Sequence, residues 1–254
     1  MTRRRAVIPV LLAGLLVVGL LAAGGIYQGV QTGLIPLNHP SRERYPVRGI
    51  DVSHYQGDVD WNRVRAAGID FAYIKATEGG DFTDPGYRAL VSGARAAGMR
   101  IGFYHYFTFC TDGAAQARQF LSVTSGPRPG DLPPVVDLEF GGNCSRVPTQ
   151  DELDRQFAAF EEPVRKVFGR SPMLYLTADF AARYLDTSLN PAASLQGKER
   201  WVRNILTEPK GGCGRWSFWQ YANRGWVDGI EKPVDLDAYC GTRDAFERTL
   251  LTPT

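Results

Sequence analysis

Two carboxylates follow one apolar run of the chain. Residues 134–139 read PVVDLE, so a single residue separates Asp137 from Glu139. Side chains alternate along a strand, so both carboxylates would face the same side, about 7 Å apart. Their mutual repulsion would raise the pKa of one of them, which could then act as a general acid. The pattern indicates acid–base chemistry at the end of a strand.

Two further runs with β-strand character also end in acids. Asp51 lies at the end of the first run, and Asp235 and Asp237 lie in the last one. If the strands close into a barrel, the first and last become neighbours, which would bring Asp51 close to Asp235. A single Asp at a strand end more commonly caps a turn or helix. Acids at three strand ends of one barrel favour a site at its mouth instead.

Other kinds of site have less support. Acidic clusters also bind Mg²⁺ or Ca²⁺, but the sequence has no EF-hand loop, no HExxH and only three histidines. It also lacks a Walker loop, a GxGxxG motif and a GxSxG elbow, which nucleotide binding and serine-triad chemistry would need. The sequence therefore predicts neither a metal nor a cofactor.

The expected mouth is rich in aromatic residues, about half of which we expect to be core. They are Tyr55, Tyr104, Tyr106, Tyr175, Trp219 and Tyr221. Flat rings beside carboxylates suit a carbohydrate, whose C–H faces stack while its hydroxyls form hydrogen bonds. The residues predict a glycoside hydrolase.

The charge of the chain argues against a nucleic-acid ligand. There are 29 Lys and Arg against 27 Asp and Glu, a net charge of +2. Three of the arginines lie at residues 3–5, so the remainder carries 2 − 3 = −1. A nucleic-acid binder needs a basic face to meet phosphates.

After residue 47, strand-like runs alternate with helical stretches. Strands are expected at 48–55, 71–77, 100–107, 134–140, 173–177, 201–206, 217–222 and 234–238, and helices at 61–67, 87–97, 113–124 and 149–168. The connections at 190–197 and 207–215 are rich in Pro, Gly and polar residues. The fold class is therefore α/β: an irregular TIM-like (β/α) barrel of parallel strands, with helices reduced in its second half.

The N-terminal segment predicts export. Residues 3–5 are basic, and residues 6–27 are apolar and uncharged. The run is longer than the apolar part of a usual signal peptide and long enough to span a bilayer. Ala22-Ala23-Gly24 leaves cleavage open, but we favour a signal-anchor. We expect a signal-anchor or signal peptide at 1–27, a linker or wrapping arm at 28–46, and the barrel at 47–254.

Cysteine usage agrees with an oxidising compartment outside the cytoplasm. The sequence has four cysteines, an even number, and no two of them form a CxxC motif: Cys110, Cys144, Cys213 and Cys240. This pattern favours two disulfides over a zinc site. Three pairings are possible. We expect Cys110–Cys144 and Cys213–Cys240, because each pair flanks segments that should be neighbours in the barrel.

Seven motifs in register point to one family. They are GIDVSHYQG at 49–57, VDW at 59–61, YIKATEG at 73–79, GFYHY at 102–106, VVDLE at 135–139, FWQY at 218–221 and VDLD at 234–237. In this order and spacing the chain closely resembles glycoside hydrolase family 25, the Chalaropsis-type lysozymes, from about residue 48 to 246. It departs from the family pattern at Leu90, where many members carry Asn, and at residues 201–203, where Trp-Val-Arg replaces Leu-Trp-Ile-Ala.

The resemblance implies hydrolysis of the β-1,4 bond between N-acetylmuramic acid and N-acetylglucosamine in peptidoglycan. It implies Glu139 as general acid/base and Asp137 as the partner of the substrate's acetamido group, with Asp51 and Asp235 lining the groove. The positions matched to substrate binding are Tyr104, Tyr175, Trp219 and Glu78. Whether the reaction retains or inverts the anomeric configuration stays open.

Two other functions fit part of the pattern. A glycan-binding protein without catalysis could keep the barrel, although it has no need of the proton donor in the DLE run. A chitinase-like glycosidase could also use a DxE strand end and an acetamido nucleophile. The expected partner is the peptidoglycan glycan strand, with the membrane as a second one if the N-terminal segment is uncleaved. The oligomeric state stays open, and we expect a monomer in the cell envelope or outside the cell.

Overall fold

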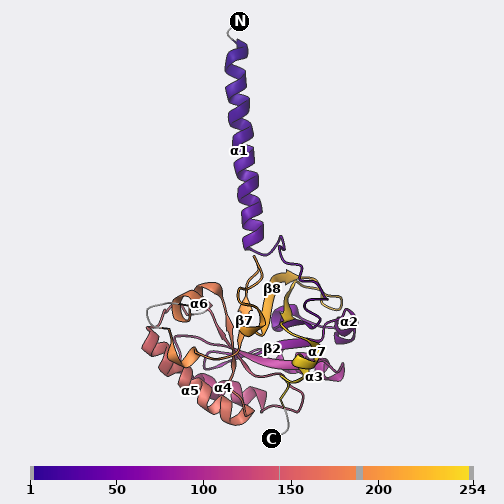
Figure 1. Cartoon of the computed structure of the whole chain (residues 1–254), viewed down its shortest axis with the longest axis vertical. Helices are drawn as coiled ribbons and strands as arrows, with labels where there is room; N and C mark the ends of the chain where they lie inside the picture. Colours follow the sequence, from indigo (N-terminus) through magenta and orange to yellow (C-terminus); the bar gives the residue numbers. More distant parts are fainter. Residues whose placement is uncertain (1–2, 143, 187–190, 252–254) are drawn as a thin grey trace.

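The computed structural model describes residues 3–142, 144–186 and 191–251, with the side chains of the first helix from Leu15 to Val30. A long helix, α1 (Arg3–Gln31), projects from one end of a rounded β/α body (Figure 1). This helix continues past the boundary expected at residue 27. Among the side chains described, no helix combines the length and the apolarity needed to cross a membrane.

The body is a closed barrel of eight strands. In order around the barrel they are β1 (Arg48–Val52), β9 (Val234–Tyr239), β8 (Phe218–Gly225), β7 (Arg200–Arg203), β6 (Met173–Leu176), β5 (Val135–Leu138), β4 (Arg100–Tyr106) and β2 (Phe71–Glu78). Pairing of β1 with β2 closes the ring, and the short β3 (Phe82–Thr83) extends β2 at its end. The expected irregular barrel is confirmed.

The direction of the last strand differs from the expectation of parallel strands. β9 runs antiparallel to both of its neighbours, β1 and β8. Only residues 226–233 link β8 to β9, whereas a parallel crossover needs about a dozen residues or more. The short link therefore forces the chain to turn back.

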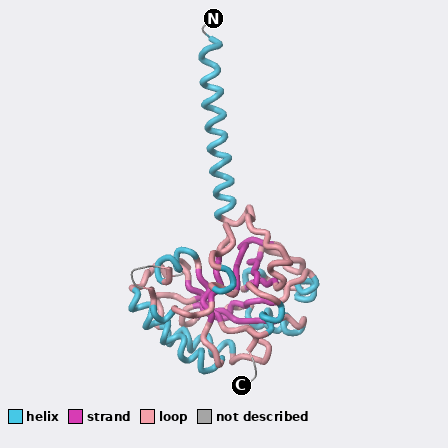
Figure 2. Tube along the Cα trace, viewed as in Figure 1, coloured by secondary structure: helices cyan, strands magenta, loops and turns pink. Residues whose placement is uncertain are grey.

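Helices surround the strands unevenly (Figure 2). They are α2 (Trp61–Ala66), α3 (Tyr87–Ala96), α4 (Gly113–Thr124), α5 (Gln150–Phe168), α6 (Ala178–Tyr184) and α7 (Arg243–Glu247). α5 begins with the predicted capping box, because Thr149 and Glu152 each bond to the other's backbone N–H. In the described chain, the connections after β7 and β8 contain only one 3-10 turn, Gly212–Gly214. The predicted loss of helices in the second half is thus confirmed.

Aromatic side chains fill the lower part of the barrel. The rings of Tyr73 and Trp201 lie 4.9 Å apart, and those of Phe71 and Phe218 lie 5.2 Å apart. Glycine is required beneath them, since a Cβ at Gly49 would come within 2.2 Å of the Phe71 ring. This packing leaves space only towards the mouth.

The segment between α1 and β1 includes an arm that lies on the barrel wall. Tyr45 packs against Trp216 and Trp219, with ring centroids 6.2 and 5.7 Å apart. The side-chain amide of Asn38 donates to the carbonyl oxygens of Asn204 and Tyr221. The arm therefore covers a stretch of wall next to the helix-poor connections.

Both expected disulfides are present. Cys110–Cys144 joins the loops that follow β4 and β5, and Cys213–Cys240 joins the 3-10 turn to the end of β9. Within the described chain, no cysteine is left free.

Candidate functional site

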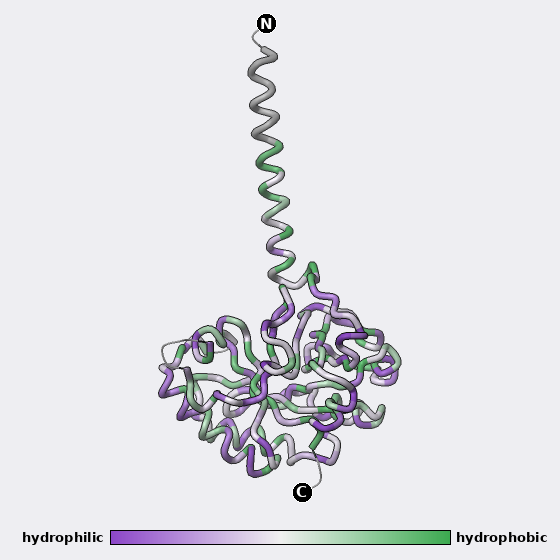
Figure 3. Tube along the Cα trace, viewed as in Figure 1, coloured by the Kyte–Doolittle hydropathy of each residue, from purple (hydrophilic) through white to green (hydrophobic). Residues whose placement is uncertain are grey.

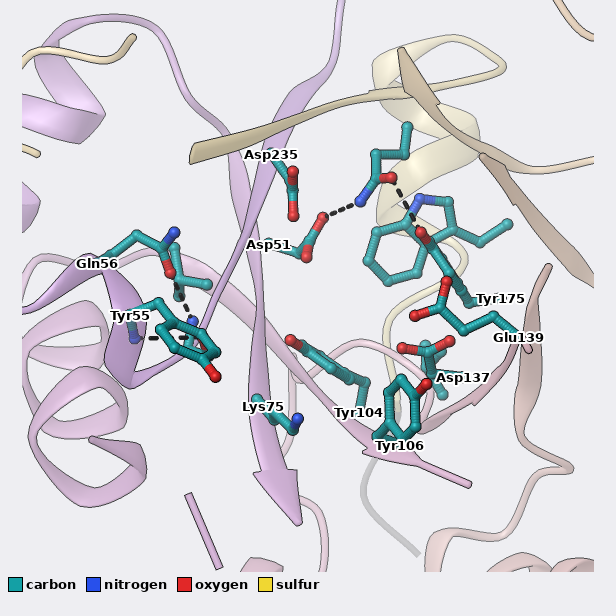
Figure 4. Close-up of a pocket in the computed structure, with 15 residues that line it drawn as sticks. Asp51, Tyr55, Gln56, Lys75, Tyr104, Tyr106, Asp137, Glu139, Tyr175 and Asp235 are labelled. Carbon is teal, nitrogen blue, oxygen red and sulfur yellow. Dashed lines mark hydrogen bonds between the residues drawn. The ribbon is translucent and has the colours of Figure 1, made fainter. Parts of the chain in front are cut away.

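A cavity of about 240 Å³ opens at the mouth of the barrel. Side chains from most of the strands reach it (Figure 4). Its lining comprises Asp51, Val52, Ser53, Tyr55, Gln56, Lys75, Tyr104, Tyr106, Val135, Asp137, Glu139, Tyr175, Trp201, Gln220 and Asp235. The four acids predicted to be catalytic, Asp51, Asp137, Glu139 and Asp235, are therefore brought together around one space.

Strand pairing explains how these acids meet. Asp51 of β1 is directly opposite Asp235 of β9 in the antiparallel ladder, which places both side chains on the same face. Asp137 and Glu139 reach the cavity from β5 and the residue that follows it, on the other side of the space (Figure 4). Closure of the barrel thus supplies the proximity that was expected from the order of the strands.

Burial controls the protonation of Asp137 and Glu139. Asp137 is 8% exposed, and its Oδ1 has no hydrogen-bond partner among the described residues. Burial raises its pKa well above the usual range, and the nearby charge of Glu139 raises it further. Burial also raises the pKa of Glu139, against the opposing charge of Arg203. This pair can hold a proton where free carboxylates would not.

A second group of carboxyls surrounds Asp51. Burial raises the pKa of Asp51 to about 6, while hydrogen bonds from Gln220, Asp235 and Asp237 lower it. Burial and the charge of Asp51 raise the pKa of Asp235 and of Asp237 well above their usual range. The arrangement favours ionisation of Asp51 before that of Asp235 or Asp237.

Gln220 is a site residue that the sequence analysis did not select. It is 3% exposed. Its Nε2 donates to Asp51 Oδ2 at 2.8 Å, and its Oε1 accepts from the Tyr175 hydroxyl at 2.9 Å. The sequence signal that could have identified Gln220 is the alternation of side chains in the strand FWQY. Gln220 shares a strand face with Phe218, whose ring fills the barrel. A polar residue on an inward face marks this position.

Lys75 brings a positive charge to the cavity wall. Its Nζ bonds to Glu78 Oε2 at 2.6 Å and lies 5.0 Å from the centre of the Tyr106 ring. Glu78 itself is outside the cavity lining. The Glu78 carboxylate is engaged by Lys75, and contact of Glu78 with substrate stays a prediction.

Trp219 lies in a different place from the other predicted substrate-binding aromatics. Tyr104 and Tyr175 line the cavity as expected, but Trp219 does not. Its indole lies in a separate buried cluster with Tyr45 and Trp216, and its Nε1 donates to the carbonyl of Asn204 at 2.8 Å. Alternation along β8 turns Phe218 and Gln220 inward, so Trp219 must point out of the barrel.

Arg203, at the end of β7, is the departure from the family pattern that acts on this site. Its positive charge lowers the pKa values of Asp51, Glu139 and Asp235. Among the described residues, no three His, Cys, Asp or Glu side chains are arranged to hold a metal ion.

Comparisons with known proteins agree on one family. The family model described as glycosyl hydrolases family 25 matches residues 50–230. The uncharacterized protein YegX of Escherichia coli K12 is 36% identical over 209 residues, which are 80% of this chain and 73% of that protein. Lysozyme M1 of Streptomyces globisporus is 32% identical over 207 residues, or 77% of this chain and 68% of that protein.

A solved structure has the same architecture. The family 25 glycosyl hydrolase from Bacillus anthracis superposes with a TM-score of 0.73 at 34% identity. The match covers 83% of this chain and 96% of that one.

The hydrogen bonds of Gln220 give a first prediction. Gln220→Leu keeps a similar volume but removes the donor to Asp51, so the pKa of Asp51 should rise above its value of about 6. The unfolding free energy should fall by about 1–3 kcal/mol, because buried polar groups lose their partners. Carboxyl ¹³C NMR titration measures the pKa, with the Asp51 signal assigned by its loss in Asp51→Asn.

The matched control is Gln119→Leu, whose amide bonds to Thr83 at an exposed position. It should leave the Asp51 titration unchanged. An Asp51 pKa that stays the same or falls in Gln220→Leu contradicts the assignment.

Proposed function

The chain belongs to glycosyl hydrolases family 25, and on this premise we propose that it is a lysozyme that uses Glu139 as its general acid and base. The chain is accordingly a glycoside hydrolase acting on peptidoglycan. The bond cleaved is the β-1,4 bond between N-acetylmuramic acid and N-acetylglucosamine. One observation carries the residue assignment: Asp51, Asp137, Glu139 and Asp235 line a single cavity with Tyr104 and Tyr175.

Glu139 is suited to protonate the leaving oxygen. Its burial raises its pKa, which favours the protonated carboxyl before the reaction. As the glycosidic C–O bond breaks, its proton passes to the leaving sugar oxygen and positive charge develops at the anomeric carbon. The resulting Glu139 carboxylate can then accept a proton from the attacking water.

Asp137 is suited to support the substrate's own nucleophile. In the route we propose, the acetamido oxygen of the sugar attacks the anomeric carbon and forms a cyclic intermediate. Asp137 lines the cavity beside Glu139, so its carboxyl group can accept a hydrogen bond from the acetamido N–H. Water then opens the ring, which gives net retention.

Direct attack by a water activated at Asp51 or Asp235 would invert the configuration instead. The surroundings of these acids favour retention. Asp51 Oδ2 already accepts a hydrogen bond from Gln220 Nε2. Burial raises the pKa of Asp235 well above its usual range, which favours the protonated form, and a protonated carboxyl cannot take a proton from water.

The reaction is tested with Glu139→Gln on purified peptidoglycan. The amide keeps the shape but has no proton to donate, so kcat should fall about 10²–10⁴-fold. Release of reducing ends measures the rate, and ¹H NMR of the fresh products shows whether the configuration is retained. Wild-type protein should release reducing ends from peptidoglycan and none from chitin.

The matched control is Glu162→Gln, a change at a solvent-exposed glutamate on α5 that pairs with Lys166. Its rate should equal that of wild type. An active Glu139→Gln enzyme refutes the role of Glu139, binding without new reducing ends refutes catalysis, and cleavage of chitin refutes the substrate.

The pH dependence is tested with Arg203→Gln. The positive charge of Arg203 lowers the pKa of Glu139, so its removal should raise that pKa. Glu139 then stays protonated to higher pH, and the basic limb of the kcat/KM profile should move upward. Arg200→Gln, at the other end of the same strand, should leave the limb in place. A downward shift or no shift in Arg203→Gln contradicts the assignment.

We further propose that the chain acts outside the cytoplasm, held by its N-terminal segment. The two disulfides need an oxidising compartment, and the order of basic and then apolar residues at 3–27 favours export. Cell fractionation with intact-mass analysis tests this, and we expect the full-length oxidised chain in the membrane fraction. A soluble exported chain lacking the segment refutes anchoring, and a reduced cytoplasmic chain refutes export.

A further inference from the structure

Four large apolar side chains are exposed where α1 meets the barrel. They are Leu34, Ile35 and Leu37 of the arm, and Trp226 just after β8, with 65, 41, 51 and 70% of their surface exposed. We call these four residues the arm patch. Isolated exposed apolar residues are common, but a group of them beside one another indicates a contact surface.

Packing of the chain brings the segments that carry these residues together. The backbone N–H of Ile35 donates to Gly29 in the last turn of α1, at 3.0 Å. Gly33 lies so close to β8 that a Cβ there would come within 1.7 Å of Asn223 Oδ1. The base of α1, the bend of the arm and the end of β8 therefore lie together (Figures 1 and 3).

Basic residues accompany the patch. A groove of about 400 Å³ between the arm and the wall is lined by Trp226 and by His39, Arg42, Arg48 and Arg224, with no acidic residue in its lining. Arg42 donates only to the carbonyl oxygens of Ala67 and Gly68, so its charge is not neutralised there. Among the described residues, Arg224 has no ion pair.

We propose that the arm patch rests on an anionic phospholipid bilayer. Leucine, isoleucine and tryptophan side chains insert at the level of the headgroups, while neighbouring arginines meet lipid phosphates. The apolar residues of α1 from Leu15 to Tyr27 are exposed and end at this same place. Charge complementarity thus selects an anionic surface over a zwitterionic one.

Docking in this way leaves the catalytic cavity free. Along β8, Gln220 faces the cavity and its neighbour Tyr221 lines the groove outside. The bilayer contact and the substrate site are on opposite sides of one strand. A docked barrel keeps its mouth open to glycan strands near the membrane.

Trp226 offers a direct probe, because the other four tryptophans, Trp61, Trp201, Trp216 and Trp219, are each 5% exposed or less. The full chain is bound to phosphatidylglycerol vesicles with brominated acyl chains, which quench tryptophan only on contact. We expect quenching of the emission component that Trp226→Phe removes, and none with brominated phosphatidylcholine. Arg224→Gln removes one positive charge from the contact, so the ratio of docked to undocked protein should fall about fivefold.

The control moves the exposed tryptophan to another face. Trp226→Phe combined with Val167→Trp places it on α5, away from the base of α1 (Figure 1), where no quenching is expected. Both variants alter exposed residues, so circular dichroism and peptidoglycan hydrolysis should match wild type. The proposal is overturned if quenching is equal at both positions or if Trp226 is not quenched. It is also overturned if the chain does not bind vesicles, or if self-association shields Trp226.

Discussion

The free-energy cost of burying carboxyl groups governs this site. Five carboxyls, those of Asp51, Asp137, Glu139, Asp235 and Asp237, lie at one end of the barrel, and burial is the largest cause of a raised pKa for each. They cannot all be ionised in such a space, so protons are retained and shared. Retained protons are what acid catalysis of glycoside cleavage requires.

The rest of the barrel makes that burial possible. Tilted and edge-to-face aromatic rings fill the lower part of the lumen, below the cavity at the mouth. Gln220 then selects which carboxyl of the Asp51 group is ionised, and Arg203 and Lys75 limit how far the pKa of Glu139 rises. Burial raises the pKa of Glu139 and the two positive charges lower it. Because these effects oppose each other, Glu139 can donate its proton and later accept one.

The outward face of β8 has a different structural role from its inward face. The helix-poor stretch near β8 would expose Trp216 and Trp219, and the arm covers them with Tyr45. Trp219 therefore stabilises the attachment of the arm. The same arm carries Leu34, Ile35 and Leu37 to the surface beside Trp226, which links the N-terminal segment to the orientation of the barrel.

Local patterns along the chain were enough to predict the strands, the capping box at Thr149, both disulfides and the four acids of the cavity. These features depend on alternation, on hydrogen bonds between near neighbours and on the order of the strands. The direction of β9, the outward face of Trp219, the ion pair that engages Glu78 and the hydrogen bonds of Gln220 were decided only in three dimensions. The last three depend on which side of the closed barrel wall a side chain faces, and that side is set by the pairing of segments that are distant in the sequence.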